Sequence, residues 1–238
     1  MSDNLSVSIC IATFNGAHFV KRQLGSIIPQ LSASDEIIIS DDSSTDDTLR
    51  IISAFNDNRI KVFAGNKFKN PARNFEFALQ QANGDVIFLC DQDDIWFDTK
   101  VAEHLKMHAK HDLVISNAIV VDADLEIMHS SFFKARGSNS GIVHNIIRNS
   151  YIGCCISINR KVLTYALPFP KGLHMHDWWI GLVAEVKGSV SFIQTPLMYY
   201  IRHNTNASGT LTTTLPLKNQ IKNRLNLIYN LIKLKIKS

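Results

Sequence analysis

Short apolar runs alternate with helix-like segments through the first half of the chain. Five runs have the length of buried strands, at residues 7–12, 36–40, 60–64, 86–90 and 113–116. Between them, apolar residues recur at three- and four-residue spacing in segments 17–28, 45–55, 72–81 and 99–108, which predicts helices. Strands that are apolar on both faces and alternate with helices predict an α/β fold, a mostly parallel sheet flanked by helices.

The second half of the chain predicts less regular structure. A polar loop spans about residues 134–140, small residues follow at 153–157, and two prolines mark a turn at 168–170. Near the end, Ile221, Leu225, Ile228 and Ile232 lie at three- or four-residue spacing, which predicts an amphipathic helix. We therefore expect one domain over residues 1–214 and a basic amphipathic C-terminal tail over residues 215–238.

Charge separates the predicted domain from the tail. The 238 residues carry a net charge of +4, but residues 215–238 alone hold six bases and no acid. The preceding residues hold 19 bases and 21 acids. A mildly acidic body argues against nucleic-acid binding, which needs a basic face across the fold. The tail would attract an anionic membrane surface, or it would dock on the body or on a partner subunit.

The cysteines and the N-terminal sequence favour a cytoplasmic protein. The four cysteines include no C-x-x-C pair, and two lie inside predicted strands, so we expect reduced thiols. Residues 1–6 lack the basic start of a signal peptide, and no apolar run approaches the ~18–20 residues of a membrane span. The basic tail would then attach the protein peripherally to the inner face of the plasma membrane.

Polar residues follow the predicted strands, at the edge where a parallel sheet binds its ligands. The fourth strand is followed by Asp91, Asp93 and Asp94, and neither type of glycine-rich phosphate loop is present. Carboxylates in this number suit Mg²⁺ or Mn²⁺, which would offset the charge of a phosphate group. The alternative is an acidic surface turn in which Asp94 or Asp98 caps the next helix.

Two carboxylates follow the second predicted strand and precede a helix. One of Asp41 and Asp42 can cap that helix, as Ser44 or Thr45 can, and the other can bind a ligand. A carboxylate that faces a nucleobase accepts the imide N–H of uracil or thymine, which cytosine and adenine lack. That role favours a uridine or thymidine carrier.

Asp177 is isolated among apolar and imidazole side chains. After Glu126 the chain contains only two acids, Asp177 and Glu185. Tryptophans and histidines at residues 174–179 would desolvate the Asp177 carboxylate and raise its pKa towards that of a general base. Two alternatives remain: Asp177 caps a helix whose tryptophans enter the core, or it binds a metal with His174 and His176, as in a hydrolase.

Six segments in a fixed order carry a family resemblance. They are residues 8–15, 40–46, 72–74, the D-x-D at 91–93, 176–179 and 200–209. Together they resemble the inverting glycosyltransferases of family 2, which have the GT-A fold, over about residues 6–209. The pattern of the second half is most similar to bacterial enzymes that build O-antigen or capsule repeats, including rhamnosyl-, galactosyl- and glucosyltransferases.

The resemblance implies a site for a nucleotide-sugar donor. By that resemblance, Thr13 and Asn15 would line the nucleotide pocket, and Asp42 would meet the base. Arg73 or Asn74 would lie near the nucleotide sugar. The donor expected from these roles is a UDP- or dTDP-sugar.

The resemblance also implies a metal site and a catalytic base. Asp91 would approach the ribose or the sugar of the donor, while Asp93 and His203 would hold Mn²⁺ or Mg²⁺. Asp177 matches the general base of the family, which takes a proton from the acceptor hydroxyl. The mechanism implied is a direct displacement that inverts the configuration of the anomeric carbon.

The sequence departs from the family pattern at three positions. Ser43 stands where glycine is more common, His176 where glutamate is, and Ile201 where arginine is. None of these changes removes a proposed catalytic carboxylate. Trp178 and Trp179, which follow the base, would lie on the acceptor side.

The function implied is transfer of a hexosyl or deoxyhexosyl unit to a hydroxyl of a lipid-linked glycan during surface polysaccharide synthesis. The acceptor would be a glycan or a polyprenyl-diphosphate-linked sugar. One alternative is a sugar nucleotidyltransferase, although the glycine- and arginine-rich first loop of such enzymes is missing. A second is a nonenzymatic nucleotide-sugar-binding module at the membrane surface, which would need no base.

Overall fold

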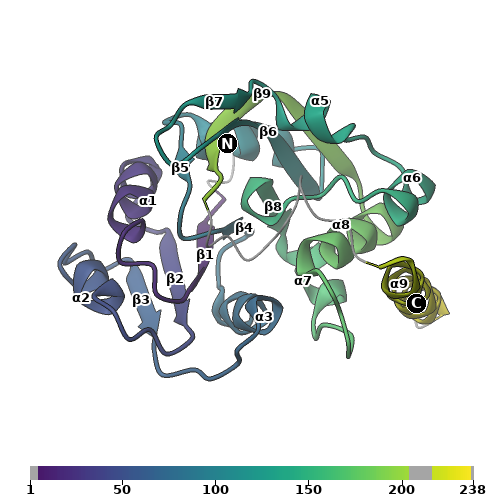
Figure 1. The fold of residues 1–238 in the computed structure, drawn as a ribbon, viewed down its shortest axis with the longest axis horizontal. Helices are drawn as coiled ribbons and strands as arrows, with labels where there is room; N and C mark the ends of the chain where they lie inside the picture. Colours follow the sequence, from purple (N-terminus) through teal and green to yellow (C-terminus); the bar gives the residue numbers. More distant parts are fainter. Residues whose placement is uncertain (1–4, 204–215, 237–238) are drawn as a thin grey trace.

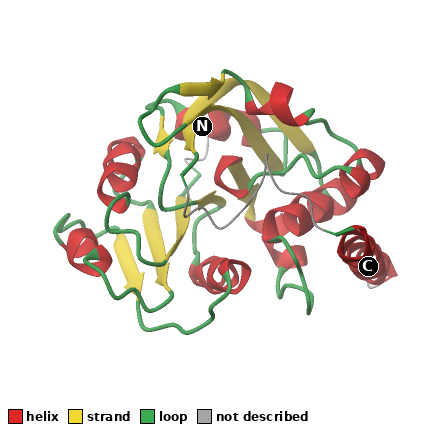
Figure 2. Cartoon of the chain, in the orientation of Figure 1, coloured by secondary structure: helices red, strands yellow, loops and turns green. Residues whose placement is uncertain are grey.

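A computed structural model describes residues 5–203 and 216–236 of the chain. Within these residues nine strands form one curled sheet (Figures 1 and 2). Its order is β3 (Ile60–Phe63), β2 (Glu36–Asp41), β1 (Val7–Thr13), β4 (Val86–Cys90), β8 (Ile156–Asn159), β6 (Leu113–Val121), β9 (Val190–Ile201) and β5 (Ile95–Trp96). The short strand β7 (Ile127–His129) pairs with β6. Residues 204–214, at the predicted end of the domain, lie outside the described residues.

The first four strands of the predicted sheet are confirmed and are parallel to one another. Strand β1 pairs with β2 on one side and with β4 on the other, so that Ile9 lies opposite both Ile37 and Phe88. Beyond β4 the direction changes, because β8 runs antiparallel to both β4 and β6. Strand β9 is parallel to β6 and carries the antiparallel β5 at its outer side.

Helices of the first half form where the spacing of apolar residues predicts them. They are α1 (Val20–Ile27), α2 (Thr48–Ser53), α3 (Pro71–Gln81) and α4 (Lys100–His108). The predicted cap of α2 at Ser44 or Thr45 is wrong, as are caps by Asp41 or Asp42. The helix begins three residues after Thr45, behind an N-cap residue, Asp47, that makes no side-chain capping bond.

Five further helices follow in the second half. They are α5 (Phe132–Arg136), α6 (Ile142–Ile147), α7 (Arg160–Ala166), α8 (His176–Lys187) and α9 (Leu217–Ile236). Helix α8 is the most deeply buried of them, since every residue from Asp177 to Ala184 is buried. Helix α9 packs beside α8 and α6 at one end of the molecule (Figure 1). Among the described residues, no helix combines the length and apolarity needed to span a bilayer.

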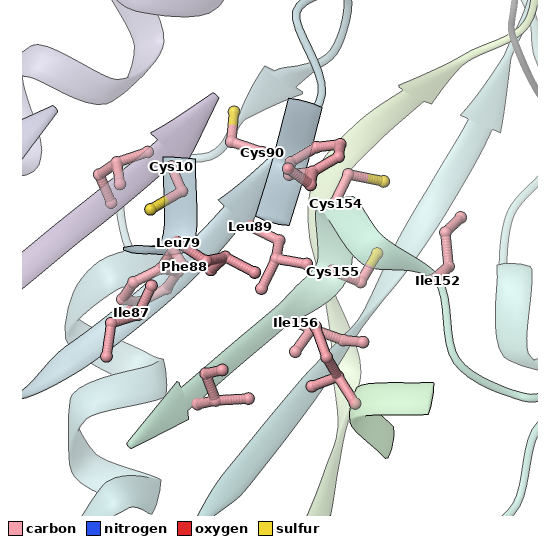
Figure 3. Close-up of a cluster of buried hydrophobic side chains, with 14 of the residues drawn as sticks. Cys10, Leu79, Ile87, Phe88, Leu89, Cys90, Ile152, Cys154, Cys155 and Ile156 are labelled. Carbon is pink, nitrogen blue, oxygen red and sulfur yellow. The ribbon is translucent and has the colours of Figure 1, made fainter. Parts of the chain in front are cut away.

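The hydrophobic core lies between β1, β4, β8 and the helices that cover them. Figure 3 shows Cys10, Cys90, Cys154 and Cys155 among its side chains. All four cysteines are buried and free, as expected for reduced thiols. Burial raises the pKa of the Cys10 thiol, so this sulfur packs as a small apolar group rather than reacting as a thiolate.

Two helical glycines differ in the space around them, and this difference generates a prediction. A Cβ at Gly181 in α8 would lie 2.2 Å from the ring of Tyr151, whereas a Cβ at Gly25 in α1 would meet nothing within 4 Å. We expect Gly181→Ala to lower the free energy of unfolding by about 1–3 kcal/mol through overpacking. Gly25→Ala should raise it by about 0.5–1 kcal/mol, because alanine favours a helix.

Urea unfolding of both variants, followed by circular dichroism, measures this difference. Equal stability of the two alanine variants would show that the Tyr151 ring moves aside at no cost.

Candidate active site

The chain connections of the sheet reverse direction between β1 and β4, and the region outside the carboxyl ends of these strands is called the crevice below. The chain leaves β1 towards β2 and β3 and returns to β4 on the opposite side of β1, which is the arrangement that creates a ligand site in open α/β sheets. Gln92 spans this crevice. The main-chain N–H of Phe14 donates to Gln92 Oε1 (3.0 Å), and Gln92 Nε2 donates to the Phe14 carbonyl (3.1 Å).

Gly16 makes the close approach of Gln92 to the first loop possible. A Cβ at Gly16 would lie 2.3 Å from Gln92 Oε1, so any larger residue would displace the amide. The middle residue of the D-x-D therefore joins the loop after β1 to the loop after β4. Both loops are held at fixed positions on either side of the crevice.

A buried polar network fixes the carboxyl ends of β1 and β2. Thr13 Oγ1 donates to Asp41 Oδ2 (2.8 Å), and Ser40 Oγ donates to Asn74 Oδ1 (2.6 Å). Asn74 Nδ2 donates to the Thr13 carbonyl (3.2 Å). Thr13 and Asn74 are buried, so their side chains shape the pocket from behind rather than forming its surface.

Asn15 and Asp42 occupy more open positions at the same edge. Asn15 adopts a left-handed backbone conformation (φ 46°), and its Oδ1 accepts a hydrogen bond from the main-chain N–H of Thr45 (2.8 Å). Asp42 Oδ1 accepts one from the N–H of Phe68 (2.6 Å). Within the described residues Asp42 Oδ2 makes no hydrogen bond, which leaves it available to a ligand. The Arg73 guanidinium forms an ion pair with Glu76 on its own helix.

Three carboxylates follow β4, and each has different partners. Asp93 Oδ2 lies 2.7 Å from His203 Nε2, and the His203 ring stacks on Phe19 with 4.4 Å between centroids. Asp94 is fully buried, and its Oδ1 accepts a hydrogen bond from the N–H of Ile201 at the end of β9 (3.0 Å). The alternative in which Asp94 or Asp98 caps α4 is wrong, since the N-cap residue is Thr99 and makes no side-chain bond.

Burial and like charge act together on these carboxylates. Burial raises the pKa of Asp91, and the negative charges of Asp93 and Asp177 raise it further. Burial also raises the pKa of Asp94, and the negative charges of Asp93 and Asp91 raise it further. The ammonium group of Lys100 opposes this effect at Asp91. Lys100 is itself buried, with its Nζ donating to the Cys154 carbonyl (2.7 Å).

Asp177 reaches the same crevice from α8. It is the second residue of the helix, behind the N-cap residue Met175, so it is not a cap. The side chain is 5% exposed, and burial raises its pKa from the ordinary 3.8 to about 6. A hydrogen bond from Gly153 and the charge of Arg136 limit that rise. A carboxylate with this pKa is ionised near neutral pH and can accept a proton.

The residues on either side of Asp177 are structural. Trp178 Nε1 donates to the Asn145 carbonyl (2.6 Å) and Trp179 Nε1 donates to the Ala166 carbonyl (2.9 Å). Both indoles are buried, so the expectation that they face an acceptor is not met in this structure. His176 stacks on Phe75 with 4.4 Å between ring centroids, and burial lowers the pKa of His176 to about 4.

Two groups of described residues could hold a divalent cation. Asp93 and His203 offer one oxygen and one nitrogen in contact, at the edge of the crevice, and both atoms suit Mn²⁺. Asp91, Asp94 and Cys154 also have ligand atoms within 4.8 Å of one another. Burial raises the pKa of that thiol and of Asp94, so this deeper group suits a hard cation less well. His174, His176 and Asp177 do not group as metal ligands in the described chain.

Some residues of the site were not identified from sequence. Gln92, Lys100 and Arg136 carry no motif signal of their own, because their roles come from contacts with segments far away in the chain. The small-residue segment 153–157, for which the sequence predicts irregular structure, contributes Cys154 and the Gly153 N–H to the site. Small size was the only available signal there.

Comparison with known proteins gives a consistent result. The family described as "Glycosyl transferase family 2" matches residues 8–165. The Escherichia coli UDP-Glc:alpha-D-GlcNAc-diphosphoundecaprenol beta-1,3-glucosyltransferase WfgD is 27% identical over 193 residues, which are 80% of this chain and 74% of WfgD. The Shigella flexneri dTDP-rhamnosyl transferase RfbG is 27% identical over 231 residues, covering 84% of this chain and 73% of RfbG.

Solved structures share the fold at lower sequence identity. S. aureus TarS 1–349 in complex with UDP-GlcNAc superimposes with a TM-score of 0.72 at 15% identity, covering 92% of this chain and 64% of the TarS 1–349 chain. The mannosyltransferase PcManGT from Pyrobaculum calidifontis, in complex with GDP-Man and Mn²⁺, superimposes with a TM-score of 0.64 at 17% identity. The match covers 88% of this chain and 59% of the PcManGT chain. The chain thus spans less than two thirds of either structure.

The raised pKa of Asp177 predicts a gain in stability when its charge is removed. In the unfolded chain this carboxylate ionises near pH 3.8, but in the fold it ionises near pH 6, so its charge opposes folding above pH 6. We expect Asp177→Asn to raise the free energy of unfolding at pH 8 by up to about 3 kcal/mol. The gain should shrink as the pH falls from about 6 towards 3.8.

Urea unfolding at pH 8 and pH 4.5, without divalent ions, measures this gain. Asp124→Asn, at an exposed loop position, is the matched control and should change stability little. A gain of the same size at both pH values would exclude ionisation of Asp177 as its cause.

Proposed function

The chain belongs to glycosyl transferase family 2 and has the GT-A fold, and from this premise we propose that it is an inverting hexosyl- or deoxyhexosyltransferase. The observation that carries the proposal is the position of Asp177. A buried carboxylate with a pKa of about 6 lies within electrostatic range of Asp91, so a proton acceptor and the D-x-D share one crevice. Inverting transfer needs a base on the acceptor side and a stabilised leaving group on the donor side.

The donor we propose is a UDP- or dTDP-sugar. Asp42 supports this choice, because it lies at the edge of the crevice with one carboxylate oxygen that can accept the imide N–H of uracil or thymine. Asn15 lies at the same edge, where its Oδ1 accepts a hydrogen bond from the Thr45 N–H. The relatives include one protein named for each nucleotide: WfgD is named for UDP-Glc, and RfbG is named as a dTDP-rhamnosyl transferase.

The reaction is a single displacement at the anomeric carbon. Asp177 accepts the proton of the acceptor hydroxyl, and the oxygen forms a bond to the anomeric carbon as the bond to the diphosphate oxygen breaks. Asp93 and His203 would hold Mn²⁺ or Mg²⁺, which stabilises the departing diphosphate when bound. Gln92 keeps the loops on the two sides of the donor at a fixed separation. The configuration of the sugar inverts.

We propose a lipid-linked acceptor in the synthesis of a surface polysaccharide such as O-antigen or capsule. WfgD is named for an acceptor that is a sugar on diphosphoundecaprenol. An acceptor of this kind stays in the bilayer, so the enzyme would work peripherally at the inner face of the plasma membrane. A sugar nucleotidyltransferase or a binding module without activity gains less support, because neither needs an ionisable carboxylate at Asp177.

Removal of the proposed base should abolish transfer without weakening donor binding. We expect Asp177→Asn to lower kcat by about 10²- to 10⁴-fold, because the amide cannot accept the hydroxyl proton. In the unchanged protein, kcat/KM should fall about tenfold per pH unit below pH 6, as Asp177 becomes protonated. Release of UDP or dTDP from nucleotide sugars measures the rate, and calorimetry measures donor affinity. A variant as active as the parent would remove Asp177 from this role.

Removal of the proposed metal ligand should act on donor binding instead. We expect Asp93→Ala to abolish the increase in donor affinity that Mn²⁺ produces, since one of two neighbouring ligand groups is lost. Titration calorimetry with UDP- and dTDP-sugars, with and without Mn²⁺, measures this effect. Asp98→Ala is the matched control, because Asp98 is exposed and lies outside the crevice. A manganese effect that survives in Asp93→Ala would place the metal elsewhere.

A further inference from the structure

Helix α9 exposes a row of large apolar side chains. Six of them, each 49–78% exposed, are Leu217, Ile221, Leu225, Tyr229, Ile232 and Ile236. At about 100° per residue they fall within an arc of about 120° along the helix. Single exposed apolar residues are ordinary, but a continuous row over five turns of one helix marks an interaction surface.

A different face of α9 attaches the helix to the body. Leu227 and Leu231 are buried in the core. Arg224 Nη2 donates to the Ile147 carbonyl (2.6 Å), and Asn226 Nδ2 donates to the Gly172 carbonyl (3.2 Å). The helix is therefore fixed on the body with its apolar row pointing away. Docking on the body and binding to a membrane, which the sequence presented as alternatives, use separate faces.

Helix α6, which packs against α9, also exposes large apolar side chains. Val143 and Ile147, one helical turn apart, are 69% and 63% exposed. Arg224 joins the two helices, since it bonds to the carbonyls of Ile146 and Ile147 at the end of α6. Figure 1 shows α6 and α9 at the same end of the molecule. We refer to the apolar row of α9 together with Val143 and Ile147 as the α6–α9 surface.

The charges on α9 are all positive. Lys218, Lys222, Lys233 and Lys235 are exposed, and the helix contains no acidic residue. Only two acids follow Glu126, and both are engaged within the fold. Asp177 is buried, and Glu185 accepts a hydrogen bond from Tyr151 (2.8 Å). At the same spacing, Lys222 and Lys233 border one side of the apolar row, whereas Lys218 and Lys235 lie within its arc near the two ends of the helix. No carboxylate side chain lies on the same helix.

We propose that the α6–α9 surface binds an anionic phospholipid bilayer, with the apolar row inserted at the level of the headgroups. Apolar side chains, an interfacial tyrosine and flanking lysines are the features of helices that lie in a membrane interface. A second copy of this chain is a poorer occupant, because a symmetric pairing would set the lysines of one α9 against those of the other. The length and apolarity of α9 do not suit a membrane span.

Because α9 is fixed on the body, a bilayer bound at the α6–α9 surface would hold the crevice in one orientation. The Arg224 guanidinium lies 5.9 Å from the centroid of the Trp178 ring, and Asp177 is the adjacent residue. Arg148, the C-cap residue of α6, has its guanidinium beside Gly137. Gly137 follows Arg136, whose charge acts on Asp177. Basic groups therefore lie between α6 and the segment that carries the proposed base. Only this orienting role rests on the proposed function; membrane binding itself does not.

Vesicle flotation with the full chain tests the proposal. The probes are vesicles of phosphatidylcholine alone and vesicles with about one third phosphatidylglycerol. We expect binding to the anionic vesicles, and at least about tenfold weaker binding to the neutral ones. The double variant Leu225→Asp/Ile232→Asp should lose at least about tenfold in affinity for the anionic vesicles.

A matched control separates apolar insertion from charge. Asn219→Asp/Asn223→Asp adds the same two charges to α9 away from the apolar row, and it should retain binding within about threefold. An equal loss in both double variants would overturn the insertion of the row. Equal binding of the parent to both vesicle types would overturn the choice of anionic lipid.

Two further measurements distinguish loss of membrane binding from unfolding and from loss of activity. Thermal unfolding confirms that each variant is folded, and UDP or dTDP release without vesicles should be the same as in the parent. A variant that loses nucleotide release without vesicles has lost the proposed activity. A variant that loses only flotation has lost membrane binding by the α6–α9 surface. Light scattering that shows a dimer broken by Leu225→Asp/Ile232→Asp, with no flotation of the parent, would assign the row to a second copy and overturn the proposal.

Discussion

Mutual repulsion among carboxylates is the constraint on which the site depends. Asp91, Asp93 and Asp177 come from two distant segments, yet the negative charge of each of the other two raises the pKa of Asp91. Water does little to screen these charges, because Asp177 is buried and Asp91 is half-buried. Among the described residues, the charge of Lys100 acts on Asp91 and that of Arg136 acts on Asp177. The Lys100 Nζ is bonded to the Cys154 carbonyl rather than to a carboxylate. A ligand that brings positive charge into this crevice therefore relieves a repulsion that the fold alone maintains.

The rest of the architecture holds these groups in place against that repulsion. Main-chain pairing of β1 with β2 and β4 sets the positions of the strand ends, and the amide of Gln92 joins the loops across the crevice. Asp94 bonds to the N–H of Ile201 and so holds the end of β9, next to His203, against the D-x-D loop. Asp177 is held by α8, in which every residue from Asp177 to Ala184 is buried. The carboxylates that repel one another are therefore held by two separate parts of the fold, the loop after β4 and helix α8.

The sequence predicted the elements that depend on neighbouring residues, and it did not predict the positions that depend on contacts between distant segments. Strands β1, β2, β3 and β4 and helices α1, α2, α3 and α4 follow from apolar periodicity, which is a property of neighbouring residues. Strand β8 owes its place to antiparallel pairing with β4 and β6, and nothing in its four residues indicates those partners. The chemical identity of Asp177 suggested a base, but its distance from Asp91 depends on the whole second half of the fold. The indoles of Trp178 and Trp179 show the same limit, because their position in the core follows from packing.

Helix α9 shows why periodicity alone could not assign its partner. Apolar residues at three- and four-residue spacing predict a helix with an apolar face, but α9 has large apolar residues on more than one side. Leu227 and Leu231 pack one side of the helix against the body, in the same core as Trp178. The row that includes Ile221 and Leu225 then has no place in that core, since Arg224 and the Asn226 amide fix the rotation of the helix. A helix that is apolar on two sides needs two partners, and the lysines along the second side determine which kind of partner fits.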